Sequence, residues 1–199
     1  LVYQGEMEVA FDRAATLIRR PADYTLEARS EFRKAPGPGK LRVVAGGKKA
    51  AASGRAVALI FDASGSMLKR MQGNKRRIDV AREVLTKAVR EHVPAGTPLA
   101  LRVFGHKEAG SCRTDLEMPL APLDPAKAAR VIGGIRAMNL ARTPIADSLA
   151  AVERDLKGAK GGAAIVLVTD GEETCGGDPG KVIEALKKKG LDVRVNIVG

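Results

Sequence analysis

The strongest constraint on the fold is a regular alternation of short apolar runs and amphipathic segments that begins at residue 56. The runs AVALIFD (56–62), LALRVFG (99–105) and AAIVLVTD (163–170) are apolar at almost every position, as strands covered on both faces of a sheet are. Segments whose apolar residues recur at helical spacing lie between them. This alternation predicts an α/β fold, with a doubly wound, mostly parallel sheet and helices on both faces.

The remaining elements are marked by capping residues and by proline. A proline that follows Asp or Thr is typical of the first position of a helix. Apolar residues at helical spacing predict a helix over 78–93, and the prolines predict helices from Pro125 to about Met138, after Pro144 and after Pro179. Two further strands are expected at 116–122, where Pro119 favours a sheet edge, and after Gly190.

The sequence divides into three parts. Residues 1–45 contain short, partly alternating apolar runs broken by Pro and Gly, which predicts a β-rich segment belonging to a small β module. Residues 46–55 are rich in Gly, Ala and Lys, a composition typical of a linker. Residues 56–199 form the α/β domain. Because the sequence begins without Met, it is interpreted as a piece of a longer protein.

Charge and hydropathy exclude some classes of function. The net charge is +11, but the basic residues are scattered and aromatic residues make up only 3% of the chain. Proteins that bind single-stranded nucleic acid usually stack bases on aromatic side chains, so no specific nucleic-acid site is expected. No apolar run reaches the length of about 18 residues that a transmembrane helix needs, so none is expected.

Polar residues at the ends of two buried strands are the candidate functional residues. Asp62, Ser64 and Ser66 follow the strand at 56–62, Asp170 ends the strand at 163–170, and Thr143 precedes a helix. If the two strands lie on either side of the point where strand order reverses, their ends meet in one crevice. Hydroxyl and carboxylate oxygens are hard ligands suited to a divalent cation such as Mg²⁺.

These residues resemble the metal-ion-dependent adhesion site (MIDAS) of von Willebrand factor type A domains. The family's Asp-x-Ser-x-Ser motif is matched by Asp62, Ser64 and Ser66, its isolated threonine by Thr143 and its second aspartate by Asp170. The resemblance implies that both serines ligate Mg²⁺ directly, with Ca²⁺ or Mn²⁺ as alternatives. It also implies that Thr143 ligates directly in a high-affinity state, and that the aspartates act largely through bound water.

The resemblance further implies an adhesion-type module rather than an enzyme, in which the cation captures an Asp or Glu carboxylate of a partner protein. It extends over 56–199, without the family's last strand and C-terminal helix, and is strongest to exported bacterial members. One alternative is a cytosolic domain that works beside a ring ATPase in assembly. Another is a metal-assisted hydrolase with Glu172 or Glu173 as base; otherwise this acidic pair is expected to be solvated or to provide secondary ligands.

Two cysteines bear on the cellular compartment. Cys112 and Cys175 follow the second and third buried strands, so both are expected at the rim that carries the metal site. A disulfide between them would indicate export, to the cell exterior or the periplasm, whereas two free thiols would favour the cytosol. A Cys-His metal site using His106 and Cys112 is not expected, because the chain has two histidines and lacks zinc-site spacing.

Overall fold

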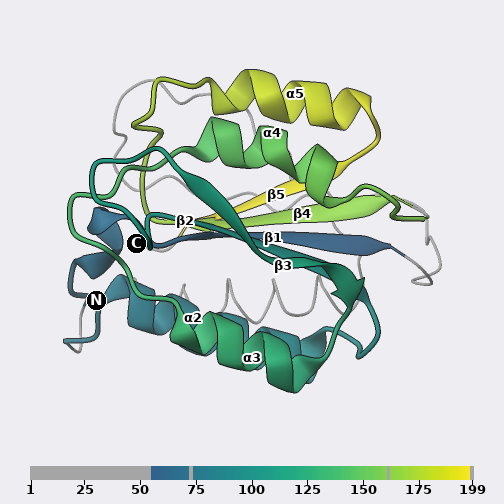
Figure 1. Cartoon of the computed structure of the whole chain (residues 1–199), viewed down its shortest axis with the longest axis horizontal. Coiled ribbons are helices and arrows are strands. Elements are labelled where there is room, and N and C mark those ends of the chain that lie inside the picture. The colour runs from purple at the N-terminus through teal and green to yellow at the C-terminus, as the bar shows by residue number, and fades with distance from the viewer. Residues whose placement is uncertain (1–54, 72–73, 161, 198–199) are drawn as a thin grey trace.

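The computed structural model describes residues 55–71, 74–160 and 162–197, which form one α/β domain (Figure 1). The β-rich segment expected at 1–45 and nearly all of the linker lie outside the described residues. Five strands form one sheet in the order β3-β2-β1-β4-β5. They are β1 Ala56–Asp62, β2 Pro98–Phe104, β3 Thr114–Pro122, β4 Ala163–Thr169 and β5 Asp192–Ile197.

The sheet is parallel except for β3, which pairs antiparallel with β2 at one edge. The predicted doubly wound, mostly parallel sheet is confirmed. β1 lies between β2 and β4, so the chain leaves β1 toward one side of the sheet and later returns to pair on its other side. The strand order therefore reverses between β1 and β4, and ligands of such sheets bind beyond the carboxyl ends of the strands at that point.

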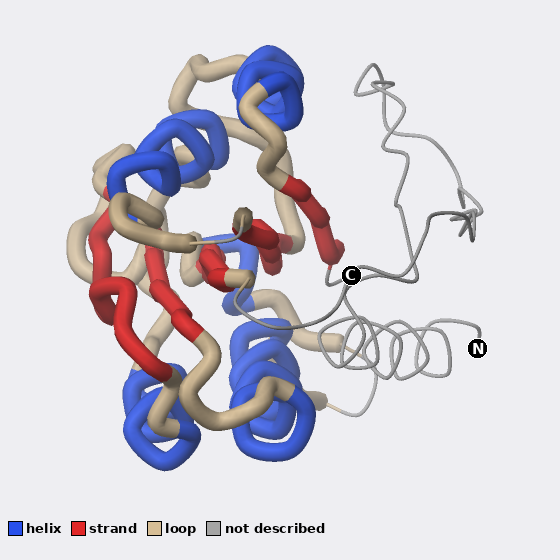
Figure 2. Tube along the Cα trace, turned by 90° about the vertical axis from the view of Figure 1, so that its right-hand side faces the viewer, coloured by secondary structure: helices blue, strands red, loops and turns tan. Residues whose placement is uncertain are grey.

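Helices cover both faces of the sheet, with α2 and α3 on one side and α4 and α5 on the other (Figures 1 and 2). The helical elements are the 3₁₀ turn η1 Gly65–Leu68, α2 Arg77–Lys87, the π-helical turn η2 Ala88–His92, α3 Pro125–Gly134, α4 Ile145–Asp155 and α5 Pro179–Lys188. The expected caps are present: Asp124 accepts hydrogen bonds from the N–H groups of Ala126 and Lys127, and Asp178 from that of Lys181.

Helix α3 is shorter than predicted. It ends at Gly134 rather than near Met138. Two consecutive glycines, Gly133 and Gly134, weaken its last turn. The following residues run as a loop, and the Met138 N–H donates to the carbonyl oxygens of Ala63 and Gly105. The loop is thereby attached to the ends of β1 and β2.

Side chains of β1 alternate between two buried layers. Leu59 and Phe61 pack with α2 and α3, while Ala58 and Ile60 pack with α4 and α5. The strand is therefore buried on both faces, as its almost uninterrupted apolar sequence predicts. This double burial fixes the direction in which the end of β1, at Asp62, emerges from the sheet.

A buried ion pair joins the sheet to helix α4. The guanidinium of Arg102 on β2 donates from Nε and Nη2 to the two carboxylate oxygens of Asp155, at 2.6 and 2.7 Å. Both residues are 8% exposed. Because both charges are paired in bidentate geometry, the cost of removing them from water is largely offset.

Candidate metal centre

The turn after β1 holds two serine hydroxyls close together. The Ser64 N–H donates to Oδ1 of Asp62 at 2.7 Å, which folds the turn back onto the aspartate. The Oγ atoms of Ser64 and Ser66 are then 3.1 Å apart. Gly65 between them packs against a second loop, because a Cβ at this position would lie 3.1 Å from the backbone nitrogen of Leu140. A side chain at this position would force the Leu140 backbone to shift by a few tenths of an ångström.

Asp170, directly after β4, meets this turn across the switch point. Its Oδ1 accepts a hydrogen bond from Ser66 Oγ at 2.6 Å, and its Oδ2 accepts one from Nη1 of Arg77 at 2.5 Å. The Asp170 side chain is fully buried. The structure therefore joins the two motifs that the sequence separates by 104 residues.

Asp62 is fully buried and both of its oxygens are occupied. Besides the Ser64 N–H on Oδ1, Oδ2 accepts from the hydroxyl of Thr169 at 2.6 Å. Burial raises the pKa of Asp62 from 3.8 to about 6, against the lowering effect of the hydrogen bonds from Ser64 and Thr169, and the charge of Asp170 raises it further. Asp62 is therefore a carboxylate held at some cost to folding.

Thr143 is buried in the loop between α3 and α4, and its backbone is fixed on both sides. Its N–H donates to Oγ1 of Thr174 at 2.8 Å, and its carbonyl accepts from the Thr174 N–H at 3.1 Å. Two residues earlier, the carbonyl of Ala141 accepts from the Gly65 N–H at 3.2 Å. The structure thus attaches the segment of Thr143 directly to the serine turn.

Comparison with known proteins finds relatives by sequence. No family model matches the chain. Two uncharacterized proteins of Bacillus subtilis (strain 168), YwmD and YwmC, are 38% and 32% identical over 153 and 162 residues. Each alignment covers 72% of this chain, and the chain spans just under two thirds of either relative, 66% and 65%.

Solved structures identify the fold. Proximal thread matrix protein 1 of the mussel byssus, with a zinc-occupied MIDAS motif, aligns with a TM-score of 0.59 at 19% identity, over 71% of this chain and 35% of its own. A von Willebrand factor type A structure from Catenulispora acidiphila aligns with a TM-score of 0.54 at 18% identity, over 77% of this chain and 33% of its own. Manganese-loaded TRAP from Plasmodium vivax aligns with a TM-score of 0.54 at 16% identity, over 73% of this chain and 57% of its own. The described domain has a von Willebrand factor type A fold.

In this domain of von Willebrand type A fold, the donor set at the switch point fits a hard divalent cation. All donors are oxygens, from the two serine hydroxyls, the threonine and the two aspartates. Ser66 donates its only proton to Asp170, so its oxygen can serve otherwise only as an acceptor or as a ligand. Asp62 already accepts two hydrogen bonds, an arrangement suited to contact with a cation through water.

Arg77 is a member of the site that the sequence did not reveal. Its guanidinium pairs with Asp170. Among the described residues, no other positively charged side chain forms an ion pair with Asp62 or Asp170. Its Nε is buried without a hydrogen-bond partner in that same part of the chain. Arg77 therefore offsets part of the negative charge that the two buried aspartates concentrate.

Glu173 holds the loops together rather than facing solvent. Its Oε2 accepts from the Ala146 N–H in the first turn of α4 at 2.8 Å, and its Oε1 accepts from the Cys175 N–H at 2.7 Å. The prediction of a solvated acidic pair is therefore wrong for Glu173, because backbone donors left open at a helix start attract a carboxylate. Glu172 is exposed.

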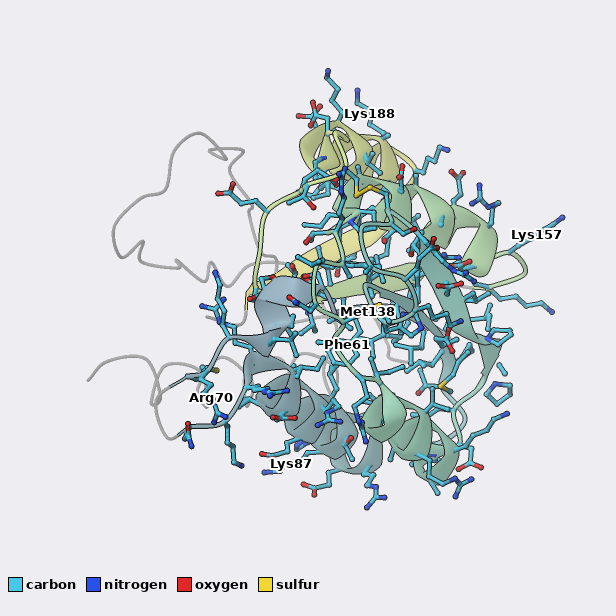
Figure 3. The ribbon with its side chains drawn as sticks, turned by 60° about the vertical axis from the view of Figure 1, so that its left-hand side comes forward. Phe61, Arg70, Lys87, Met138, Lys157 and Lys188 are labelled. Carbon is cyan, nitrogen blue, oxygen red and sulfur yellow. A yellow bond between two sulfur atoms is a disulfide. The ribbon has the colours of Figure 1, made fainter. Side chains whose placement is uncertain are left out.

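The predicted disulfide between Cys112 and Cys175 is confirmed, with 5.8 Å between the Cα atoms. It is drawn as a yellow sulfur–sulfur bond in Figure 3. The bond joins the β2–β3 loop to the β4–α5 loop, which carries Asp170 and Thr174. Two of the loops around the candidate site are therefore covalently linked.

A second cluster of polar groups lies at the end of β2. Ligand atoms of His106, Asp115 and Glu117 lie within 4.8 Å of one another, and His106 Nε2 is 3.0 Å from Glu117. Cations already occupy both carboxylates: Lys107 Nζ is 2.5 Å from Glu117, and Arg113 makes a bidentate pair with Asp115. This cluster is an ion-pair network in which positive side chains stand where a metal would bind.

Proposed function

We propose that this domain is a divalent-cation-dependent, adhesion-type protein-binding module. Asp62, Ser64, Ser66, Thr143 and Asp170 would hold the cation, and the cation would bind an Asp or Glu carboxylate of a partner protein. The observation that carries this proposal is the convergence of two serine hydroxyls with two aspartates whose side chains are buried at the switch point of the sheet.

The charges of the site favour an anionic partner. Two aspartates and Arg77 sum to one negative charge, so a bound divalent cation would leave the site with one positive charge. Neutral hydroxyl ligands donate less charge to a cation than carboxylates do, which leaves it attractive to an outside carboxylate. Oxygen ligands favour Mg²⁺, with Ca²⁺ or Mn²⁺ as alternatives; related folds hold zinc in the mussel protein and manganese in TRAP.

Binding rather than catalysis is supported by the hydrogen bonds of Glu173, one of the two glutamates considered as a base. Both oxygens of Glu173 are occupied by backbone N–H groups, so it is poorly placed to remove a proton from water. Turnover of a phosphoester that depends on Asp170 would contradict this part of the proposal.

An extracellular or periplasmic location is supported by the disulfide, since such bonds persist in oxidising compartments. No helix of the described residues is long and apolar enough to cross a membrane. Mass spectrometry of the native protein that found two free thiols would instead favour the cytosolic alternative.

The first test is cation binding by the full chain. Electron paramagnetic resonance of free Mn²⁺ should show one bound ion per chain, displaced by excess Mg²⁺. Ser66→Ala should lose this binding while its circular dichroism stays unchanged, because the hydroxyl is part-buried and its loss leaves the backbone of the turn in place. Ser111→Ala, which removes a hydroxyl from the β2–β3 loop outside the site, should bind as the native chain does.

The second test concerns the carboxylate. Peptides selected for binding in Mg²⁺ should lose affinity when their acidic residue is changed from Glu to Gln, and all binding should disappear with a chelator. Binding that persists in the chelator, or equal Mn²⁺ affinity in Ser66→Ala, would overturn the proposed function.

A further inference from the structure

Leu140 is a conspicuous residue on the loop that precedes Thr143. Among the described residues, two large hydrophobic side chains are exposed: Leu116 at 37% and Leu140 at 74%. Leu140 also has a φ of 63°, a left-handed conformation that glycine or asparagine adopts far more easily than leucine. An exposed leucine alone needs no explanation, but one held in an unfavourable conformation does.

The surrounding contacts impose this conformation. The Ala141 N–H closes a turn on the Met138 carbonyl at 3.3 Å, and the Gly110 N–H donates to the Leu140 carbonyl at 2.9 Å. Met138, labelled beside Phe61 in Figure 3, is itself bonded through its N–H to the ends of β1 and β2. Each of these contacts uses backbone atoms, so a glycine at position 140 would keep all of them.

The leucine side chain therefore adds strain and is left mostly in solvent. Its backbone nitrogen lies against Gly65, at the centre of the Ser64–Ser66 turn. Leu140 therefore belongs to the loop that packs directly on the serine turn of the candidate cation site.

Exposed basic residues on the loops that carry the candidate site outnumber the exposed acidic residues Glu108 and Glu172. Lys69 and Arg70, on the segment that follows the serine turn, and Arg142, two residues after Leu140, are all exposed. Arg70 is labelled at the outer edge of this segment in Figure 3. Glu172 is an exposed acidic residue on the β4–α5 loop. A partner segment that is acidic overall would complement this rim.

We propose that Leu140 is the apolar contact of the binding surface, so that the domain selects acidic protein segments carrying an apolar side chain next to the captured carboxylate. This rests on the proposed function, because the cation fixes the carboxylate beside Leu140. The carboxylate supplies attraction to the cation, and the neighbouring apolar side chain supplies selectivity among acidic sequences. An anionic membrane is the competing occupant of an exposed leucine among basic residues.

The test uses a displayed library of random peptides, selected on the immobilised full chain in Mg²⁺. Enriched sequences should combine an acidic residue with Leu, Ile, Met or Phe within two positions of it. The best peptide should bind Leu140→Asn about tenfold more weakly than the native chain, the effect of exposing one leucine-sized contact. Asn adopts a positive φ readily, so this variant should fold.

Three controls separate recognition from structure. Leu140→Met should restore most of the affinity, and Leu116→Thr, at the other exposed leucine, should leave it unchanged. Mn²⁺ affinity should be the same in Leu140→Asn as in the native chain. A loss of Mn²⁺ binding in that variant would show that Leu140 maintains the site, and would overturn its assignment as a contact.

The remaining outcomes are distinguishable. Metal-dependent peptide binding that ignores Leu140, or peptides enriched without apolar residues, would overturn this inference and leave the proposed function intact. Chelator-insensitive selection, or no enrichment in Mg²⁺, would overturn both. Cation-independent binding to phosphatidylglycerol vesicles that is lost in Leu140→Asn would assign the leucine to a membrane surface instead.

Discussion

Replacing Asp62 with asparagine should stabilise the metal-free protein at neutral pH while removing cation binding. Burial raises the pKa of this carboxyl from 3.8 to about 6. At about 1.4 kcal/mol per pKa unit, keeping it ionised costs the folded state about 3 kcal/mol at pH 7.5. Asparagine carries no charge but accepts with one oxygen, whereas Asp62 accepts from both Ser64 and Thr169. The weaker hydrogen bonding offsets about 1 kcal/mol, which leaves a net gain of about 2 kcal/mol.

The pH dependence of this gain has a definite sign. The folded pKa of Asp62 lies above the unfolded value, so the folded state binds the proton more tightly. The stabilisation from protonation is fully present below the unfolded pKa and is lost as the pH rises through about 6. The advantage of Asp62→Asn should therefore fall from about 2 kcal/mol at pH 7.5 to about zero at pH 4.

Urea denaturation of the full chain with its disulfide intact, in a chelator at several pH values, measures this difference. Glu172→Gln, an exposed carboxylate on the same rim, controls for the loss of one negative charge. Saturating Mg²⁺ should then make the unmutated protein the more stable of the two. Only the unmutated protein binds the cation, and a ligand at about 100 times its Kd stabilises the folded state by about 2.7 kcal/mol. An Asp62→Asn protein that is less stable than the native protein in chelator at pH 7.5, or an advantage independent of pH, would refute the reasoning.

Three further changes test the scaffold of the site by denaturant titration. Arg102→Met should cost about 3–5 kcal/mol, because it leaves Asp155 buried without its partner, and the additional change Asp155→Leu should recover most of this loss. Gly105→Ala should destabilise far more than Gly110→Ala: both glycines have positive φ, but a Cβ on Gly105 would lie 2.5 Å from the Ser64 nitrogen, whereas at Gly110 the space is open. Replacing both disulfide cysteines with serine should cost about 4 kcal/mol, the loop entropy for their separation of 63 residues.

The fold and the centre of the site could be predicted because their signals are local. β1 and β4 are uninterrupted apolar runs, and each leads into an aspartate at its end. The helix expected at 78–93 is present, but its last turn widens into the π-helical η2, which buries both Ala88 and Val89. No periodicity in the sequence marks that widening, because it depends on how these side chains fit the core.

The partners of the aspartates could not be predicted, because they depend on approach between distant segments. Arg77 is one of three consecutive basic residues, and the sequence gives no reason to distinguish it from Lys75, which pairs with exposed Glu83. Only its place at the start of α2, facing the end of β4, brings it to Asp170. The sequence likewise gives no reason to distinguish Thr169, whose hydroxyl donates to Asp62, from the other residues of the apolar strand.

The loops of the site are held by contacts that need no cation. The Cys112–Cys175 disulfide fixes the β4–α5 loop, the reciprocal bonds between Thr174 and Thr143 pass that constraint to the next loop, and Ala141 passes it to the serine turn. The first link is covalent and the hydrogen bonds use backbone donors or acceptors, so none of these links occupies the hydroxyls of Ser64 and Ser66. A cation would therefore bind ligands that are already close together. Little of the free energy of binding the cation and the captured carboxylate would be lost in ordering the loops.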